Sequence, residues 1–83
     1  MQFKDDYELY RTISRNIKYY RELSHLTQSE LAEKSHLSLS YISKIEALGC
    51  HKSVSLSALH QIARALDQEM TLFFERQQDS TKC

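Results

Sequence analysis

The chain has 83 residues, enough for one small domain and too few for two. Hydrophobic residues make up 41% of it, proline is absent and glycine occurs once, which argues against the turn-rich folds of small all-β proteins. No apolar stretch approaches the length of a membrane span, and the N-terminus lacks the basic and then apolar pattern of a signal peptide. The composition therefore predicts a single all-helical domain in the cytoplasm.

Basic and acidic residues balance at 11 each, but they are unevenly distributed along the chain. The net charge is −2 over residues 1–10, +3 over residues 11–52 and −1 over residues 53–83. A neutral chain is not typical of nucleic-acid-binding proteins. The basic middle segment weakens that exclusion, because a local excess of positive charge attracts phosphate.

The first predicted helix extends from Asp6 to Leu23. Apolar residues recur at three- and four-residue spacing and form the inward face: Tyr10, Ile13, Ile17 and Tyr20. The two other tyrosines of this segment, Tyr7 and Tyr19, are expected at the edge of the core rather than in an aromatic surface that stacks bases.

The second predicted helix begins at Thr27 and ends near Ser35. Thr27 and Glu30 have the spacing of a capping box, in which each side chain accepts a hydrogen bond from the other residue's backbone. A tight turn after a helix usually needs a residue with positive φ, which is most often glycine. Here His36 is the candidate for that conformation.

Residues 38–47 form the third predicted helix, with Ser38 as its N-cap. Ile42 and Ile45 are expected to face the core. With about two turns each, the second and third helices are not stable alone and depend on the rest of the domain. The outward face of the third helix carries Leu39, Ser40, Tyr41, Ser43 and Lys44.

The remaining chain predicts a fourth helix capped by Ser55 and a short fifth helical element in the segment "MTLFFER". The domain thus spans residues 1–76, and residues 77–83 are expected to form a disordered tail. The inward residues of the fourth helix are Leu56, Leu59, Ile62, Ala63 and Leu66.

No motif predicts catalysis or metal binding. The only cysteines, Cys50 and Cys83, are expected to be reduced thiols, and the four histidines are too scattered for a zinc site. No nucleophile, base and orienting acid share a motif. We therefore predict a protein that is not an enzyme and has no cofactor, metal or small-molecule ligand.

Three segments together resemble the Xre family of helix-turn-helix DNA-binding regulators, which are Cro/cI-like proteins. They are "RELSHLTQSELA" at residues 21–32, "LSLSYISKIE" at residues 37–46 and "SLSALHQIARAL" at residues 55–66, followed by Phe73 and Phe74. The resemblance covers roughly residues 13–74. It implies a compact five-helix, lambda-repressor-like domain with its helix-turn-helix at residues 27–47.

The resemblance also implies a function, a sequence-specific transcriptional regulator on double-stranded DNA that acts in a bacterial or phage-type host cytosol, associated with the nucleoid. The segments "YISKIE" and "FFE" look like restriction–modification controller proteins, whereas Leu39 replaces an arginine common there. A phage or mobile-element repressor therefore stays open as the subclass. The implied DNA-binding residues are Thr27, Gln28, Ser38, Leu39, Ser40, Tyr41, Ser43, Lys44, His51 and Lys52.

The chemistry of these residues suits a major-groove helix with modest direct readout. Lys44 can donate to guanine or to a phosphate, Ser40 discriminates weakly and Leu39 can pack on a thymine methyl. We expect the shape of the DNA to contribute the remaining specificity.

Arg21 and Glu46 match a family salt bridge that joins the first helix to the end of the third. A structural role is the first interpretation, and a phosphate contact by Arg21 is the alternative. Removing one partner of a buried pair is expensive, since the other charge is left unpaired.

Family members usually bind pseudo-palindromic operators as twofold dimers. The implied dimer interface is Met70, Leu72, Phe73 and Phe74, with one phenylalanine inward and the other in the interface. A chain ending at Leu66 is accordingly expected to remain folded but to associate weakly. The alternative function is an antitoxin-like or other protein-interaction module with secondary DNA binding, although few residues follow Phe74 to form a partner-binding segment.

Overall fold

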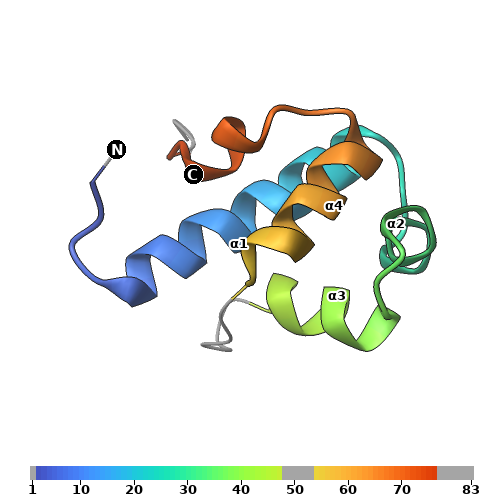
Figure 1. The fold of residues 1–83 in the computed structure, drawn as a ribbon, viewed down its shortest axis with the longest axis horizontal. Helices are drawn as coiled ribbons and strands as arrows, with labels where there is room; N and C mark the ends of the chain where they lie inside the picture. The colour runs from blue at the N-terminus through green and yellow to red at the C-terminus, as the bar shows by residue number, and fades with distance from the viewer. Residues whose placement is uncertain (1, 48–53, 77–83) are drawn as a thin grey trace.

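The chain folds into a cluster of short helices around one long helix, seen in a computed structural model that describes residues 2–47 and 54–76. The all-α prediction is confirmed, but the fifth element is a 3₁₀-helix, so the described chain has four α-helices. Figure 1 shows α1 running across the molecule, with α3 on one side of it and η1 on the other. The elements are α1 (Asp6–Leu23), α2 (Gln28–Ser35), α3 (Leu39–Glu46), α4 (Leu56–Leu66) and η1 (Met70–Phe74).

Side-chain caps fix where the helices begin. The Thr27 hydroxyl accepts from the Glu30 backbone N–H at 3.0 Å, and the Glu30 carboxylate accepts from the Thr27 N–H at 2.9 Å, which completes the predicted capping box. Ser38 and Ser55 accept from backbone N–H groups three residues ahead, at 3.0 and 3.1 Å. Each such cap contributes about 1 kcal/mol to stability.

Left-handed residues other than glycine end three of the helices. His36 has φ of 62°, as its place in the turn predicted, and His25 and Asp67 follow α1 and α4 with φ of 60° and 57°. At His36 and Asp67 the cap N–H donates to carbonyls of the last helical turn. Each left-handed residue costs roughly 1 kcal/mol relative to an ordinary helical one, so these ends depend on the surrounding packing.

All four α-helices and η1 contribute to one hydrophobic core. Tyr10 and Tyr20 pack against it and Tyr7 and Tyr19 lie at its exposed edge, as expected. None of the helices in the described ranges is long and apolar enough to cross a membrane. The buried apolar residues of the cluster are Ile13, Ile17, Leu31, Ala32, Ile42, Ile45, Leu59, Ile62, Ala63, Leu66 and Phe73.

Leu56 does not take the inward place that its spacing predicted. It lies at the first position of α4 and is 71% exposed, whereas burial begins at Ala58 and Leu59. The periodic pattern identifies a face of the helix. It does not show how far along the axis that face is covered.

The element η1 is part of the core and not an appendage. Phe73 is completely buried and meets Tyr20 edge-on, with ring centroids 5.5 Å apart. The buried Asn16 amide donates to the Phe73 and Glu75 carbonyls at 2.8 and 2.7 Å. A chain ending at Leu66 would lose this part of the core, which argues against the expectation that it stays folded.

The full burial of Phe73 also removes it from the predicted dimer interface. No surface of this side chain is left for a second copy. Phe74, by contrast, is half-buried, so one phenylalanine does point inward and the other remains partly accessible.

Replacing Phe73 with alanine should destabilise the fold by about 3–5 kcal/mol, because it leaves a cavity in the core. Phe74→Ala is the matched control and should cost clearly less, since that side chain keeps part of its surface in solvent. Urea unfolding at low protein concentration measures both. Equal losses for the two variants would contradict the inward placement of Phe73.

Candidate nucleic-acid interface

The third helix divides into a buried and a free face. Ile42 and Ile45 are at most 2% exposed, whereas Leu39 is 49% exposed. Ser40, Ser43 and Lys44 are exposed as well, and Tyr41 is half-buried against the core. The outward side chains predicted to meet DNA are therefore accessible in the folded domain.

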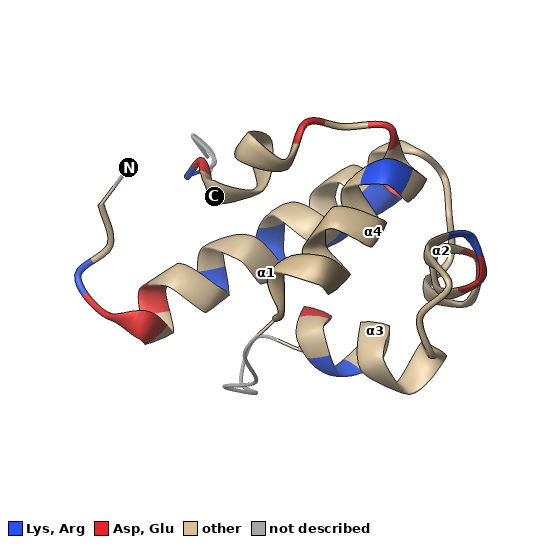
Figure 2. Cartoon of the chain, in the orientation of Figure 1, with Lys and Arg blue, Asp and Glu red and all other residues tan. Residues whose placement is uncertain are grey.

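The charges of α3 reinforce this division. Figure 2 shows basic and acidic residues toward the C-terminal end of α3. They are Lys44, which is exposed, and Glu46, which is 6% exposed and paired internally. The free face of α3 thus carries a single positive charge and no negative one, which suits a surface that approaches phosphates.

The start of α2 adds helix N–H groups to the candidate interface. Thr27 caps the helix and Gln28 is its first residue, so unpaired N–H groups and the positive end of the helix dipole are close to both. The oxygens of Thr27 and Ser38 already accept from their own helices, which leaves their O–H groups as possible donors to phosphate. This end of α2 has the chemistry of a phosphate contact.

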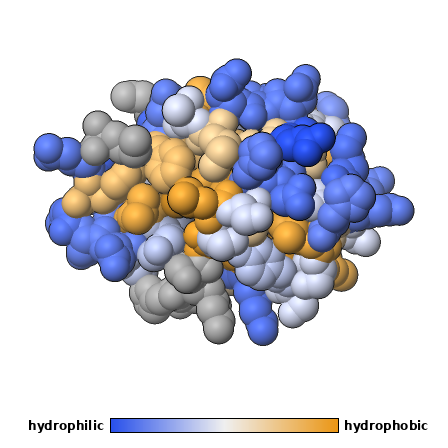
Figure 3. Space-filling view, in the orientation of Figure 1, coloured by the Kyte–Doolittle hydropathy of each residue, from blue (hydrophilic) through white to orange (hydrophobic). Residues whose placement is uncertain are grey.

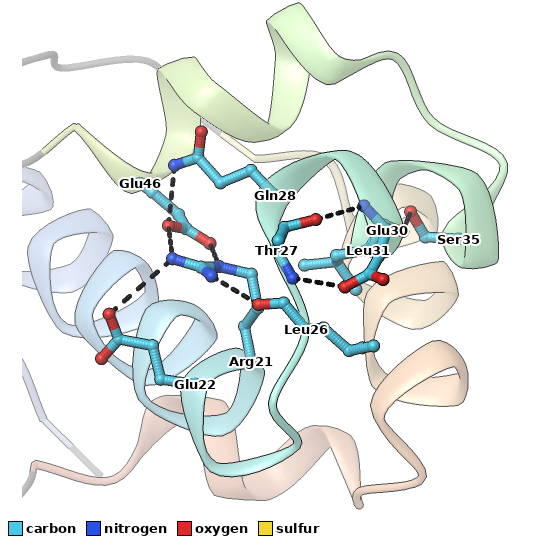
Figure 4. A network of polar contacts seen from close by, with 9 residues as sticks. All are labelled: Arg21, Glu22, Leu26, Thr27, Gln28, Glu30, Leu31, Ser35 and Glu46. Carbon is cyan, nitrogen blue, oxygen red and sulfur yellow. Dashed lines mark hydrogen bonds and ion pairs between the residues drawn. The ribbon is translucent and has the colours of Figure 1, made fainter.

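A buried ion pair joins α1 to the end of α3 (Figure 4). Arg21 donates to Glu46 through Nε at 2.7 Å and Nη2 at 3.0 Å, and through Nη1 to the Leu26 carbonyl at 2.7 Å. The hydrogen bonds to Glu46 raise the pKa of the Arg21 guanidinium above its usual value, against the opposing effect of burial. Because the guanidinium faces inward with its nitrogens engaged, we assign Arg21 the structural role.

Gln28 is tied into the same arrangement. Its Nε2 donates to Glu46 Oε1 at 3.0 Å, so one carboxylate holds α1, α2 and α3 together. Figure 4 shows the Gln28 carbonyl oxygen directed away from Glu46. Its Nε2 retains a second N–H, which leaves the predicted phosphate contact as a hypothesis that this bond pre-orients.

The structure thus brings the site residues of α2 and α3 together on adjoining helices. His51 and Lys52, predicted to contact the DNA backbone, lie outside the described residues. Within residues 2–47 and 54–76, no three histidine, cysteine, aspartate or glutamate side chains gather into a metal-binding group.

Glu46→Gln should destabilise the domain by about 3–5 kcal/mol, because Arg21 would remain buried without its counter-charge. The double variant Arg21→Met with Glu46→Leu should recover much of that loss, since no buried charge is left. Glu22→Gln is the control, because Glu22 lies 3.9 Å from Arg21 but is 59% exposed and should change little. Denaturant unfolding of the wild type, Arg21→Met, Glu46→Leu and the double variant completes a double-mutant cycle, with Glu46→Gln and Glu22→Gln measured beside it. Simple additivity of the two single losses would refute the coupling.

Comparison with known proteins places this geometry in a family. Residues 17–73 match the family model described as helix-turn-helix. Control protein C.SmaI of Serratia marcescens is 34% identical over 65 residues, which cover 78% of this chain and 75% of that protein.

Two solved structures have a similar fold. The restriction–modification controller protein C.AhdI from Aeromonas hydrophila is 29% identical with a TM-score of 0.72, over 78% of this chain and 96% of that one. The hypothetical transcription factor NHTF from Neisseria has a TM-score of 0.79 at 22% identity, over 96% of this chain and 90% of that one, and shows the fold alone. The chain therefore belongs to the Xre-type helix-turn-helix family, whose members are DNA-binding transcription regulators and not enzymes.

Proposed function

We propose that the protein is a homodimeric, sequence-specific regulator of the restriction–modification controller type. Each copy inserts α3 into the major groove of one half of a pseudo-palindromic operator. The observation that carries the proposal is the free outer face of α3, whose inner face is anchored by the core and by the Arg21–Glu46 pair. The names of C.SmaI and C.AhdI support the controller subclass.

The groove contacts follow from the accessible side chains. A major groove about 12 Å wide accepts a single helix. Lys44 provides the only charge on the free face and donates to guanine or to phosphate, while Leu39 offers an apolar contact for a thymine methyl. The hydroxyls of Ser40 and Ser43 bond either donors or acceptors and discriminate little. Much of the specificity is then carried by DNA shape.

Phosphate contacts on either side of α3 position the helix. Thr27 and Gln28 present the N-terminus of α2, and Ser38 and Tyr41 flank the start of α3. His51 and Lys52 complete the proposed backbone contacts by sequence alone. Such contacts hold orientation and register but carry no sequence information.

Lys44→Ala should weaken binding to the operator by about 1–3 kcal/mol and should relax specificity at one base position, if this side chain reads a base. Lys34→Ala is the matched control, because Lys34 is equally exposed but lies in the last turn of α2. The operator is first selected from random duplexes, and affinities are then measured at fixed salt concentration. An equal loss on specific and unrelated duplexes would assign Lys44 to phosphate instead.

The proposed dimer uses the residues of η1 that are not fully buried in the core. Figure 3 shows hydrophobic residues gathered on the face formed by α1, α4 and η1. Met70 and Phe74 are half-buried against the core, whereas Leu72 is half-buried without being part of that packing. Burying such side chains between two copies gives about 25 cal/mol for each Å² of apolar surface removed from water.

The size of the domain is compatible with this arrangement. Its principal extents are 32 × 24 × 22 Å. Half-sites one helical turn apart are separated by about 34–36 Å, so two copies placed side by side can present their α3 helices at that spacing.

Leu72→Glu should convert the dimer to a monomer, because two carboxylates would face each other across the twofold axis. The monomer fold should remain intact, since Leu72 is not packed on the core. Thr71→Glu is the control, as Thr71 is the exposed neighbour on η1. Sedimentation equilibrium reports the association and circular dichroism the fold. A folded dimer that persists in Leu72→Glu would rule out this interface.

A further inference from the structure

A cavity opens between the outer side of α1 and Arg76, two residues after the end of η1. Its volume is ≈ 190 Å³, well above the roughly 10–15 Å³ that one water molecule needs. No lining residue belongs to α2 or α3, so the cavity is separate from the candidate nucleic-acid interface. It is lined by Glu8, Arg11, Thr12, Arg15, Asn16 and Arg76.

The cavity carries an excess of positive charge. Arg11 and Arg15 are exposed on successive turns of α1, and neither forms a hydrogen bond or ion pair with another described residue. Like charges at this spacing repel each other and weaken the helix slightly. Glu8 is the single carboxylate in the lining and is already paired with Arg76 at 3.1 Å. Three cations and one anion leave two unmatched positive charges.

The far wall of the cavity is held in place. Arg76 donates through Nη2 to the Gln2 carbonyl at 2.6 Å and through Nε to Glu8 at 3.3 Å, and its guanidinium lies over the Phe3 ring at 5.2 Å from the centroid. Its Nη1 has no partner among the described residues. The Glu8 carboxylate accepts from the Lys4 N–H at 2.7 Å, and this bond together with Arg76 keeps the pKa of Glu8 below its usual value. A ligand would therefore meet a largely formed site.

We propose that this cavity binds a free oxyanion of the phosphate class, such as pyrophosphate or a phosphate monoester. Guanidinium groups match phosphate oxygens with paired N–H donors, and the Thr12 hydroxyl adds a further donor at the same wall. A doubly charged anion balances the two unmatched charges, whereas a single carboxylate would balance only one. The ligand bridges α1 and the segment after η1.

The experiment measures thermal unfolding with sodium pyrophosphate against sodium chloride at equal ionic strength. The Tm of the wild type should rise with pyrophosphate concentration, since a ligand that binds the folded state stabilises it. Arg11→Gln with Arg15→Gln should lose most of that rise. Lys18→Gln is the matched control, because Lys18 is exposed on α1 but does not line the cavity. Arg11→Lys with Arg15→Lys should keep part of the effect, as charge remains but the fork is lost.

Two results would overturn the proposal. A Tm rise that is absent in the wild type, or equal in all variants, would show that pyrophosphate has no site here and acts at most as a general salt. The second result is a variant Arg11→Gln with Arg15→Gln that keeps the Tm rise but binds an unrelated duplex more weakly than Lys18→Gln does. It would assign the cavity to the nucleic-acid backbone. Neither result involves α3, so the proposed operator recognition is tested independently by Lys44→Ala.

Discussion

The geometry of the proposed DNA-binding surface depends on a single buried carboxylate. Glu46 ends α3, accepts two hydrogen bonds from Arg21 of α1 and a third from Gln28 of α2. The carboxylate is thereby satisfied on both oxygens, which offsets the cost of burying it. Helices of about two turns have little stability of their own, so their mutual angle must come from contacts of this kind. The arrangement sets how α3 is presented, while Ile42 and Ile45 set how firmly it is held.

The contact between Gln28 and Glu46 links the interior of the domain to the proposed phosphate contact. Gln28 lies at the N-terminus of α2, where a phosphate would be expected, yet its amide is oriented by Glu46 from the other side. A side chain held in this way loses less rotamer freedom when it meets DNA. In the proposed complex, interior packing and the phosphate contact are thus coupled through one amide group.

The helical elements were largely predictable because their signals are local. The bounds of α1 follow from apolar spacing, the start of α2 from a capping box and the left-handed turn from the place of His36. Each of these depends on residues no more than a few positions apart, or on one repeated spacing. The resemblance to a known family added the groove-facing side chains, which exposure of Leu39 and its neighbours supports.

What the sequence did not reveal depends on contacts between distant segments. Asn16 reaches the carbonyls of Phe73 and Glu75, 57 and 59 residues away, and nothing in the local pattern distinguishes it from a solvent-facing asparagine. The prediction for Leu56 was wrong for the opposite reason, since its spacing is correct but the first residue of α4 lies beyond the part of the helix that the core covers.

In the proposed dimer, Asn16 also has a consequence for which chains can pair. It attaches η1 through main-chain carbonyls, and Phe73 supplies the only fully buried side chain of that element. Positions 71 and 72 can therefore change their chemistry while the backbone of η1 stays in place. In the proposed dimer, pairing preference is then adjustable separately from folding, so two related chains in one cell can avoid forming mixed pairs without changes to their interiors.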